Sequence, residues 1–175
     1  MMVSIKPVEI VEADLARLEH QQAIVKLIDA YASDPMGNGQ ALGDEVLKNL
    51  IPALRQHPTT YVFLAYQEGR SIGLAICFLG FSTFAAKPLM NIHDLAVLPD
   101  CRGQGIGTSL LQEVARKARE LGCCKLTLEV QENNLRARRV YENIGFSTAQ
   151  YVKEAGNVLF LTKRCPEGAK YISPG

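Results

Sequence analysis

The chain has 175 residues, of which 47% are hydrophobic and 21% are charged, and its formal net charge is +1. This length and composition are typical of one globular domain, expected here to span residues 1–175. The near-zero charge supplies no field that would attract nucleic acid or an anionic membrane. The most apolar run, residues 72–80, is about half as long as a membrane-spanning helix must be.

Two further features favour a cytoplasmic protein. The N-terminal stretch MMVSIKPVEIVEAD carries acidic residues where a secretory signal has its apolar segment. The five cysteines form no C-x-x-C pair, so neither a structural zinc site nor another metal site is expected, and free thiols fit a reducing compartment. A catalytic role for Cys101 is the less favoured alternative.

In the first half of the chain, the hydrophobic pattern predicts a strand, two helices and a hairpin. The expected ranges are a strand at 3–10, a helix at 15–32, a loop at 33–44, a helix at 44–55 capped by Asp44, and strands at 59–66 and 71–79. The last two runs are rich in β-branched and aromatic residues, and the turn QEGR separates them, which is typical of a hairpin.

The second half reads as strand, helix, strand, helix and a last hairpin. The expected ranges are a strand at 89–98 ended by Pro99, a helix at 105–121 ended by Gly122, a strand at 125–130, a helix at 134–144 closed by Gly145, and strands at 151–153 and 158–162. A right-handed crossover places the strand at 89–98 parallel to the one at 125–130. The order predicts an α/β fold with a mixed sheet.

The stretch RGQGIGT places Gly103, Gly105 and Gly107 directly before a helix. It is not a dinucleotide fingerprint, because the sixth residue from Gly103 is Thr108, and it lacks the lysine of a Walker loop. One glycine would be enough for a turn. Successive N–H groups at the positive end of a helix bind a diphosphate, and side chains would block that approach. Arg102 adds a positive charge beside the same anion.

The stretch LAVLPDCRGQGIGTSLL resembles the acetyl-coenzyme A motif of the GNAT superfamily of N-acetyltransferases, Gln/Arg-x-x-Gly-x-Gly/Ala. Arg102, Gly105 and Gly107 occupy its defining positions. The downstream stretch LEVQENNLRARRVYENIGF is similar to the next motif of the superfamily. Its matching positions are Asn134, Ala137, Tyr141, Gly145 and Phe146. The resemblance covers about residues 89–146.

This resemblance implies a centrally splayed mixed sheet flanked by helices, with acetyl-CoA as cosubstrate. The strands at 89–98 and 125–130 would separate, and the pantetheine arm would bond to the main chain around Leu95 and Val97. An amide-bearing ligand there satisfies backbone groups that the splay leaves unpaired. The implied coenzyme-binding set is Leu95, Ala96, Val97, Arg102, Gly103, Gln104, Gly105, Ile106, Gly107, Thr108, Asn134 and Tyr141.

The resemblance also implies a proton donor for the departing sulfur. Tyr141 matches the position from which relatives often donate that proton, and a phenol suits the task because it stays neutral at physiological pH. By spacing alone, Tyr141 fits the apolar stripe of its helix as an ordinary core residue. Asn134 matches a residue that touches the pantetheine and is equally placed to cap the helix.

At the expected proton acceptor the sequence departs from the resemblance, because this chain carries His93-Asp94 where relatives frequently have a Glu-Asp pair. Histidine has an unperturbed pKa near 6.5, which suits a general base. On a regular strand His93 faces the same side as Leu95, and Asp94 faces the opposite side. We therefore rank His93 above Asp94. A structural histidine with solvent as the base, and Glu129 on the neighbouring strand, are the alternatives.

The expected reaction is direct transfer of an acetyl group to a primary amine of a small molecule in a ternary complex. Relatives build acceptor pockets from segments that correspond to residues 31–44, 81–87 and 151–158. The acidic residues there that would attract an amine are Asp34, Asp44 and Glu45. The alternatives are a protein N-terminus or lysine as acceptor, or a non-catalytic acetyl-CoA sensor. No nucleic-acid or membrane partner is expected. Relatives often form dimers, so the resemblance is compatible with a homodimer.

Overall fold

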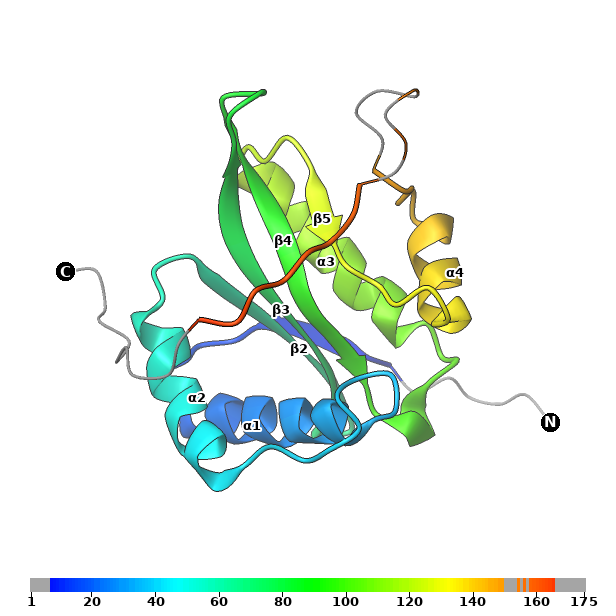
Figure 1. Cartoon of the computed structure of the whole chain (residues 1–175). Helices are drawn as coiled ribbons and strands as arrows, with labels where there is room; N and C mark the ends of the chain where they lie inside the picture. Colours follow the sequence, from blue (N-terminus) through cyan, green and yellow to red (C-terminus); the bar gives the residue numbers. More distant parts are fainter. Residues whose placement is uncertain (1–6, 150–153, 155, 157, 166–175) are drawn as a thin grey trace. The chain divides into compact units, whose positions relative to one another are not determined.

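The computed structural model describes residues 7–149, 154, 156 and 158–165, in two compact units, Met1–Asn134 and Leu135–Gly175. The first unit contains the sheet, and the second contains a helix (Figure 1). The elements of the first unit are β1 (Glu9–Glu12), α1 (Leu18–Ser33), α2 (Asp44–Gln56), β2 (Thr60–Gln67), β3 (Arg70–Ser82), β4 (Lys87–Val97), the 3-10 turn η1 (Pro99–Cys101), α3 (Ile106–Glu120) and β5 (Leu126–Leu128). The helix of the second unit is α4 (Leu135–Asn143).

The strands form one mixed sheet in the order β1-β2-β3-β4-β5. Neighbours from β1 to β4 are antiparallel, and β4 and β5 are parallel, as the crossover rule predicts. The predicted hairpin between β2 and β3 is confirmed. Its turn uses Glu68 and Gly69, both with positive φ, at 51° and 75°.

Helices cover both faces of this sheet. On one face, α1 and α2 pack over the side chains of β2 and β3 (Figure 1). That cluster includes Ile24, Leu27, Ile51, Leu64, Leu74 and Ile76. On the other face, a Cβ added to Gly73 would lie 3.3 Å from Leu110 Cδ1 of α3. Burying a leucine or isoleucine stabilises a fold by about 1.5–3 kcal/mol, so both layers are held mainly by apolar packing.

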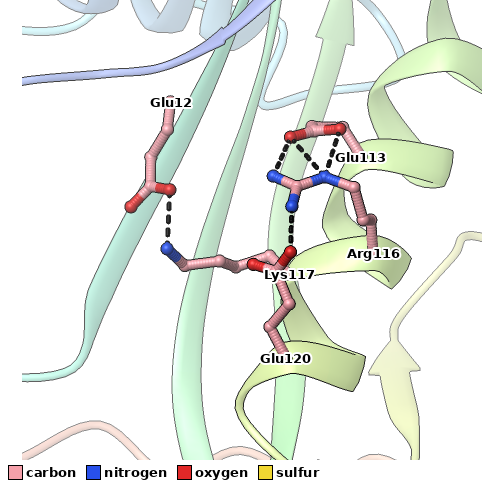
Figure 2. Close-up of polar contacts among 5 residues, drawn as sticks. All are labelled: Glu12, Glu113, Arg116, Lys117 and Glu120. Atoms are coloured by element: carbon pink, nitrogen blue, oxygen red, sulfur yellow. Dashed lines mark hydrogen bonds and ion pairs between the residues drawn. The ribbon is translucent and has the colours of Figure 1, made fainter.

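Polar contacts on the outer surface of α3 add to this packing (Figure 2). Lys117 donates to a carboxylate oxygen of Glu12 on β1 at 2.7 Å, and Arg116 bonds Glu113 and Glu120 along its own helix. Exposed ion pairs of this kind contribute about 0–1 kcal/mol each. The position of α3 therefore depends on its buried face.

The predicted splay between β4 and β5 is confirmed. The two strands pair only where Met90–Ile92 meets Leu126–Leu128, and β4 then continues to Val97. In the described part of the chain, the far end of β4 has no ladder with β5. This leaves a strand edge on which an extended, amide-bearing chain can form hydrogen bonds.

A β-bulge interrupts β4 at His93. In the ladder with β3, Ile76 pairs with Asp94, whereas the next residue, Cys77, pairs with Ile92. His93 is thus one extra residue on β4. A bulge of this kind bends the strand and shifts the alternation of its side chains.

The bulge turns His93 and Asp94 toward the same face. Asp94 shares a face with its partner Ile76, which packs under α1 and α2. The ring of His93 lies 5.4 Å from the ring of Phe78, which packs against the same cluster. The expectation that Asp94 faces away from His93 is therefore wrong, because it assumed a regular strand.

Smaller corrections concern element ends. α2 begins at Asp44 as expected, but its N-cap is Gly43, which has no side-chain cap. The carboxylate of Asp44 in the first turn favours the helix through the macrodipole instead. No helix within the described residues has the length and apolar character needed to cross a membrane.

The predicted strand at residues 158–162 is wrong, because residues 158–165 are irregular in the second unit. The side chains from Val158 to Leu161 are between 52% and 83% exposed. A strand is stabilised by cross-strand neighbours, and high β-propensity alone does not supply them. Its predicted partner at 151–153 lies outside the described residues.

Candidate active site

The start of α3 presents main-chain donors to solvent. Gly105 is the N-cap, has φ 80° and forms no side-chain cap. Its carbonyl accepts the N–H of Ser109 at 3.0 Å, which closes the first turn. The N–H groups of residues 106–108 precede that bond and have no acceptor inside the helix. They form an anion-binding end of the kind that helix N-termini provide.

The glycines keep this end open. Gly103 also has a positive φ, 79°, and a Cβ on either Gly103 or Gly105 would meet no atom within 4 Å. Gly107 lies inside the helix, and its added Cβ would touch only Val97 Cγ2, at 4.0 Å. Two of the glycines are therefore required by backbone conformation, whereas Gly107 only clears space. We call residues 102–108 the glycine loop.

Other members of the predicted binding set contribute to the glycine loop in different ways. Ile106 is 1% exposed, so its side chain packs into the core and it contributes only its main-chain N–H to the loop. Gln104 is exposed and Thr108 is half-buried, and both carry an N–H that belongs to the loop. The chemistry available here is main-chain hydrogen bonding to an anion.

Arg102 does not point freely into solvent. Its Nε donates to the carbonyl of Val97 at 2.9 Å, and its Nη2 donates to the carboxylate of Asp34 at 2.6 Å. The Arg102 and Asp34 side chains are 24% and 10% exposed. The positive charge predicted to face a diphosphate is thus paired with a carboxylate from the end of α1.

The stretch Leu95–Val97 lies where the resemblance places the pantetheine arm. On one edge it pairs with Gly73–Ala75 of β3, and on the other it extends past the end of β5. All three residues are half-buried, including Ala96. One carbonyl of this stretch, that of Val97, already bonds Arg102.

Asp94 is half-buried, and its surroundings shift the pKa of its carboxyl. Burial raises the pKa of this carboxyl above its ordinary value, and the nearby His93 lowers it to a smaller extent. A carboxylate in such a setting holds a proton more strongly than an exposed aspartate does. Raised carboxylate pKa values of this kind are characteristic of general bases.

Tyr31, at the end of α1, lies close enough to two carboxylates for their charges to affect the pKa of its phenol. Burial raises the pKa of its phenol most, and Asp94 and Asp34 raise it further. The phenol therefore stays neutral and able to donate a hydrogen bond at physiological pH. We call Tyr31, Asp34 and Asp94 the acidic corner. Sequence reasoning included Tyr31 only as the first residue of the expected acceptor segment 31–44 and gave it no role of its own, because no motif marks a tyrosine near the end of a helix.

The competing bases lie in more open positions. His93 is exposed, and its ring packs edge-on against Phe78. Glu129 follows β5 and is exposed as well.

The second unit contains Tyr141 on α4. The Tyr141 side chain is half-buried, and its ring lies 5.9 Å from the ring of Phe146 in an edge-on contact. The carbonyl of Tyr141 accepts N–H groups from Ile144 and Phe146, and Gly145 has φ 97°, which closes the helix as predicted. Asn134 stands immediately before α4, where a cap is expected.

A thiol mechanism through Cys101 is not supported. The side chain is buried, and burial first and the Asp100 carboxylate second raise the pKa of its thiol. A nucleophilic cysteine needs the opposite shift, because the thiolate is the reactive form. The cysteines in the described part of the chain are free.

Comparison with known proteins identifies the family. The model of the acetyltransferase (GNAT) family matches residues 24–146. An uncharacterized N-acetyltransferase of Archaeoglobus fulgidus is 35% identical over 54% of this chain and 65% of its own length. The thialysine N-epsilon-acetyltransferase of Bos taurus is 34% identical over 48% of this chain and 47% of its own length. This chain thus spans about half to two thirds of those two relatives.

Solved structures show the same fold. The crystal structure of a probable acetyltransferase has a TM-score of 0.74 at 24% identity and covers 89% of this chain and 99% of its own. The aminoglycoside N-acetyltransferase AAC(6′)-Iy, solved in complex with CoA, has a TM-score of 0.71 at 19% identity and covers 91% of this chain and 97% of its own. The chain belongs to the GNAT family of acetyltransferases.

Proposed function

We propose that this chain is an N-acetyltransferase that moves an acetyl group from acetyl-CoA to a primary amine of a small molecule. The observation that carries the proposal is the start of α3, where Gly103 and Gly105 adopt positive φ values and leave main-chain N–H groups open. Those donors match the diphosphate of CoA, which AAC(6′)-Iy contains in its structure. The family match supports the same cosubstrate.

The free edge of β4 supports the position of the pantetheine arm. Residues Leu95–Val97 continue beyond β5, so the amides of an extended arm find backbone partners there. A thioester on such an arm would lie along the edge of β4 near the bulge at His93.

Asp94 is the proposed base, in place of His93. The bulge places it on the α1–α2 side, and its raised pKa fits proton acceptance from an ammonium. The neutral amine then attacks the thioester carbonyl carbon, and the carbon–sulfur bond breaks. The coenzyme leaves as a thiolate, which accepts a proton from the phenol of Tyr141 by the role that its motif implies. The attacking nitrogen gives up its second proton as the amide forms, and this proton offsets the one that the phenol supplied.

The acceptor class rests on relatives. The similar bovine protein is named for thialysine, and the similar solved structure is named for aminoglycosides. Both are small amines, which supports a small acceptor here. An N-alpha-acetyltransferase, MAK3 of Arabidopsis thaliana, is also 32% identical over 50% of this chain, so protein N-termini belong in the same assay.

A thiol-release assay tests the proposal. The full chain is incubated with acetyl-CoA in an amine-free buffer, and small amines, polyamines, amino acids and peptides are added separately. We expect amine-dependent release of CoA with at least one small amine. Release with peptides alone would move the acceptor class to proteins. Saturable CoA binding with no release from any amine would instead favour a sensor, and absence of CoA binding would overturn the proposal.

A further inference from the structure

The loop between α1 and α2, residues 34–42, folds back on the end of α1 through main-chain hydrogen bonds. The carbonyl oxygens of Ala32 and Asp34 each accept two N–H groups from it. The loop passes so close to α1 that a Cβ on Gly37 would overlap the carbonyl oxygen of Tyr31. We call residues 34–42 the acceptor loop, because the sequence resemblance implies that residues 31–44 contribute to the acceptor pocket.

One side chain connects the acceptor loop to the glycine loop. Asp34 Oδ1 accepts the N–H of Met36 at 2.8 Å, while Oδ2 accepts Arg102 Nη2 at 2.6 Å. Arg102 also holds the end of β4 through Val97. Figure 1 shows the loop after α1 reaching the end of β4, consistent with this contact.

The Asp34–Arg102 pair is stronger than an ordinary surface contact. Charge-assisted hydrogen bonds between ionised partners are about twice as strong as neutral ones, and low exposure limits their screening. Because Asp34 is 10% exposed, loss of its charge would leave the guanidinium of Arg102 poorly compensated. The pair therefore transmits a restraint from one loop to the other.

The two ends of this connection face different parts of the proposed reaction. Arg102 directly precedes Gly103, at the base of the diphosphate cradle. Asp34 lies beside Tyr31, whose pKa is raised by both Asp34 and the proposed base Asp94. A ligand that fixes the glycine loop thus also restrains the segment next to the reacting amine.

We propose that Asp34 is a positioning residue through which coenzyme binding at the glycine loop orders the acceptor loop, so that the amine binds more tightly to the loaded protein. This inference rests on the proposed function. By linkage, the amine tightens coenzyme binding by the same factor, and such couplings are typically about 5–150-fold.

Hydrogen exchange on the full chain, with and without CoA, tests the coupling without turnover. In the wild type, CoA slows amide exchange at residues 36–42. Asp34→Asn still binds CoA but loses this slowing, because the amide keeps an acceptor for the Met36 N–H and lacks the charge that faces Arg102. Arg102→Gln, which removes the guanidinium, gives the same loss at a CoA concentration that saturates this variant, and it covers the case in which Asp34→Asn does not fold.

Asp29→Asn is the matched control. Its carboxylate accepts the N–H of Leu42 at 2.8 Å, so it also shapes the acceptor loop but does not bond Arg102. This variant keeps the CoA-dependent slowing. With the best amine from the thiol-release assay, Asp34→Asn raises the acceptor KM about tenfold at saturating acetyl-CoA, which is within the usual coupling range, and changes kcat little. Asp29→Asn leaves both values unchanged.

The outcomes separate the two proposals. If the wild type does not bind CoA, the proposed function fails. If CoA binds and exchange at residues 36–42 does not change, or if Asp34→Asn keeps the full slowing, only the coupling fails. An equal effect of Asp29→Asn and Asp34→Asn would likewise contradict it, because general damage to the loop would then explain both.

Discussion

The glycine loop and the acidic corner are built by opposite means. The glycine loop is made of consecutive residues, and its functional groups are main-chain N–H groups set by the φ values of Gly103 and Gly105. The acidic corner gathers Tyr31 and Asp34 from the end of α1 and Asp94 from β4, and its functional groups are side chains. A site of the first kind is robust to distant changes, whereas one of the second kind depends on packing and burial.

The largest expected effect follows from breaking the backbone of the glycine loop. Gly105→Val places a β-branched residue at φ 80°, a conformation that L side chains rarely adopt. We expect CoA affinity to fall at least about a hundredfold, equivalent to about 2.8 kcal/mol. Calorimetric titration with CoA measures it, with circular dichroism as a check on folding. Normal binding by a folded Gly105→Val would contradict the diphosphate assignment.

The next prediction concerns Asp94, the proposed base in the acidic corner. Asp94→Asn removes the proposed proton acceptor. A general base typically accelerates a reaction by about 10²–10⁴-fold, so we expect turnover to fall by that factor. The affinity for CoA is expected to stay unchanged. In the wild type, kcat/KM falls as the pH drops through the raised pKa of Asp94, at a higher pH than for an ordinary aspartate. His93→Gln is the control and retains this acid limb. Loss of the acid limb of the pH profile in His93→Gln would identify His93 as the base instead.

The same variant has a consequence for stability. Because folding raises the pKa of Asp94, the folded state loses stability as the pH rises through that raised value. The neutral amide of Asp94→Asn is free of this loss. Its Tm at neutral pH is therefore expected to equal or exceed that of the wild type, as measured by thermal unfolding. A lower Tm would mean that the carboxylate is stabilised by contacts beyond those described.

A smaller fall in turnover is expected for the sulfur-side donor. Tyr141→Phe removes only the phenolic oxygen, so the ring contact with Phe146 persists. We expect turnover to fall on the order of 10²-fold, at the low end for general-acid catalysis, with CoA affinity nearly unchanged. Steady-state thiol release measures the turnover, and calorimetry measures the CoA affinity. Unaltered turnover would remove Tyr141 from the mechanism.

The smallest effect sharpens the description of the glycine loop. Gly107→Ala adds a Cβ that touches only Val97 Cγ2 at 4.0 Å, in a helix where alanine is favoured over glycine by about 0.5–1 kcal/mol. We expect a Tm about 1–4 °C higher and a CoA affinity several-fold lower, because the methyl group enters the anion's approach. A rise in Tm with unchanged affinity would show that the diphosphate does not approach residue 107.

Much of the fold follows from local patterns. The hairpin of β2 and β3, the strand β4, the helix α3 and the parallel placement of β5 all lie close to their predicted ranges. The last predicted strand does not form at residues 158–162, because a short apolar run by itself provides no cross-strand partner. Element type is thus a local property, whereas pairing depends on the rest of the chain.

For the candidate site, too, some features follow from local sequence and others depend on tertiary packing. The sequence alone predicted the open, glycine-containing start of α3, since glycine φ freedom and a helix start are encoded in a few adjacent residues. Only the tertiary structure decided that Asp94 is half-buried with a raised pKa whereas His93 is exposed, because a bulge in β4 reset the alternation. It also decided that Arg102 pairs with Asp34, which is 68 residues away. Side-chain partners at such separations are set by packing, which no local pattern in the chain records.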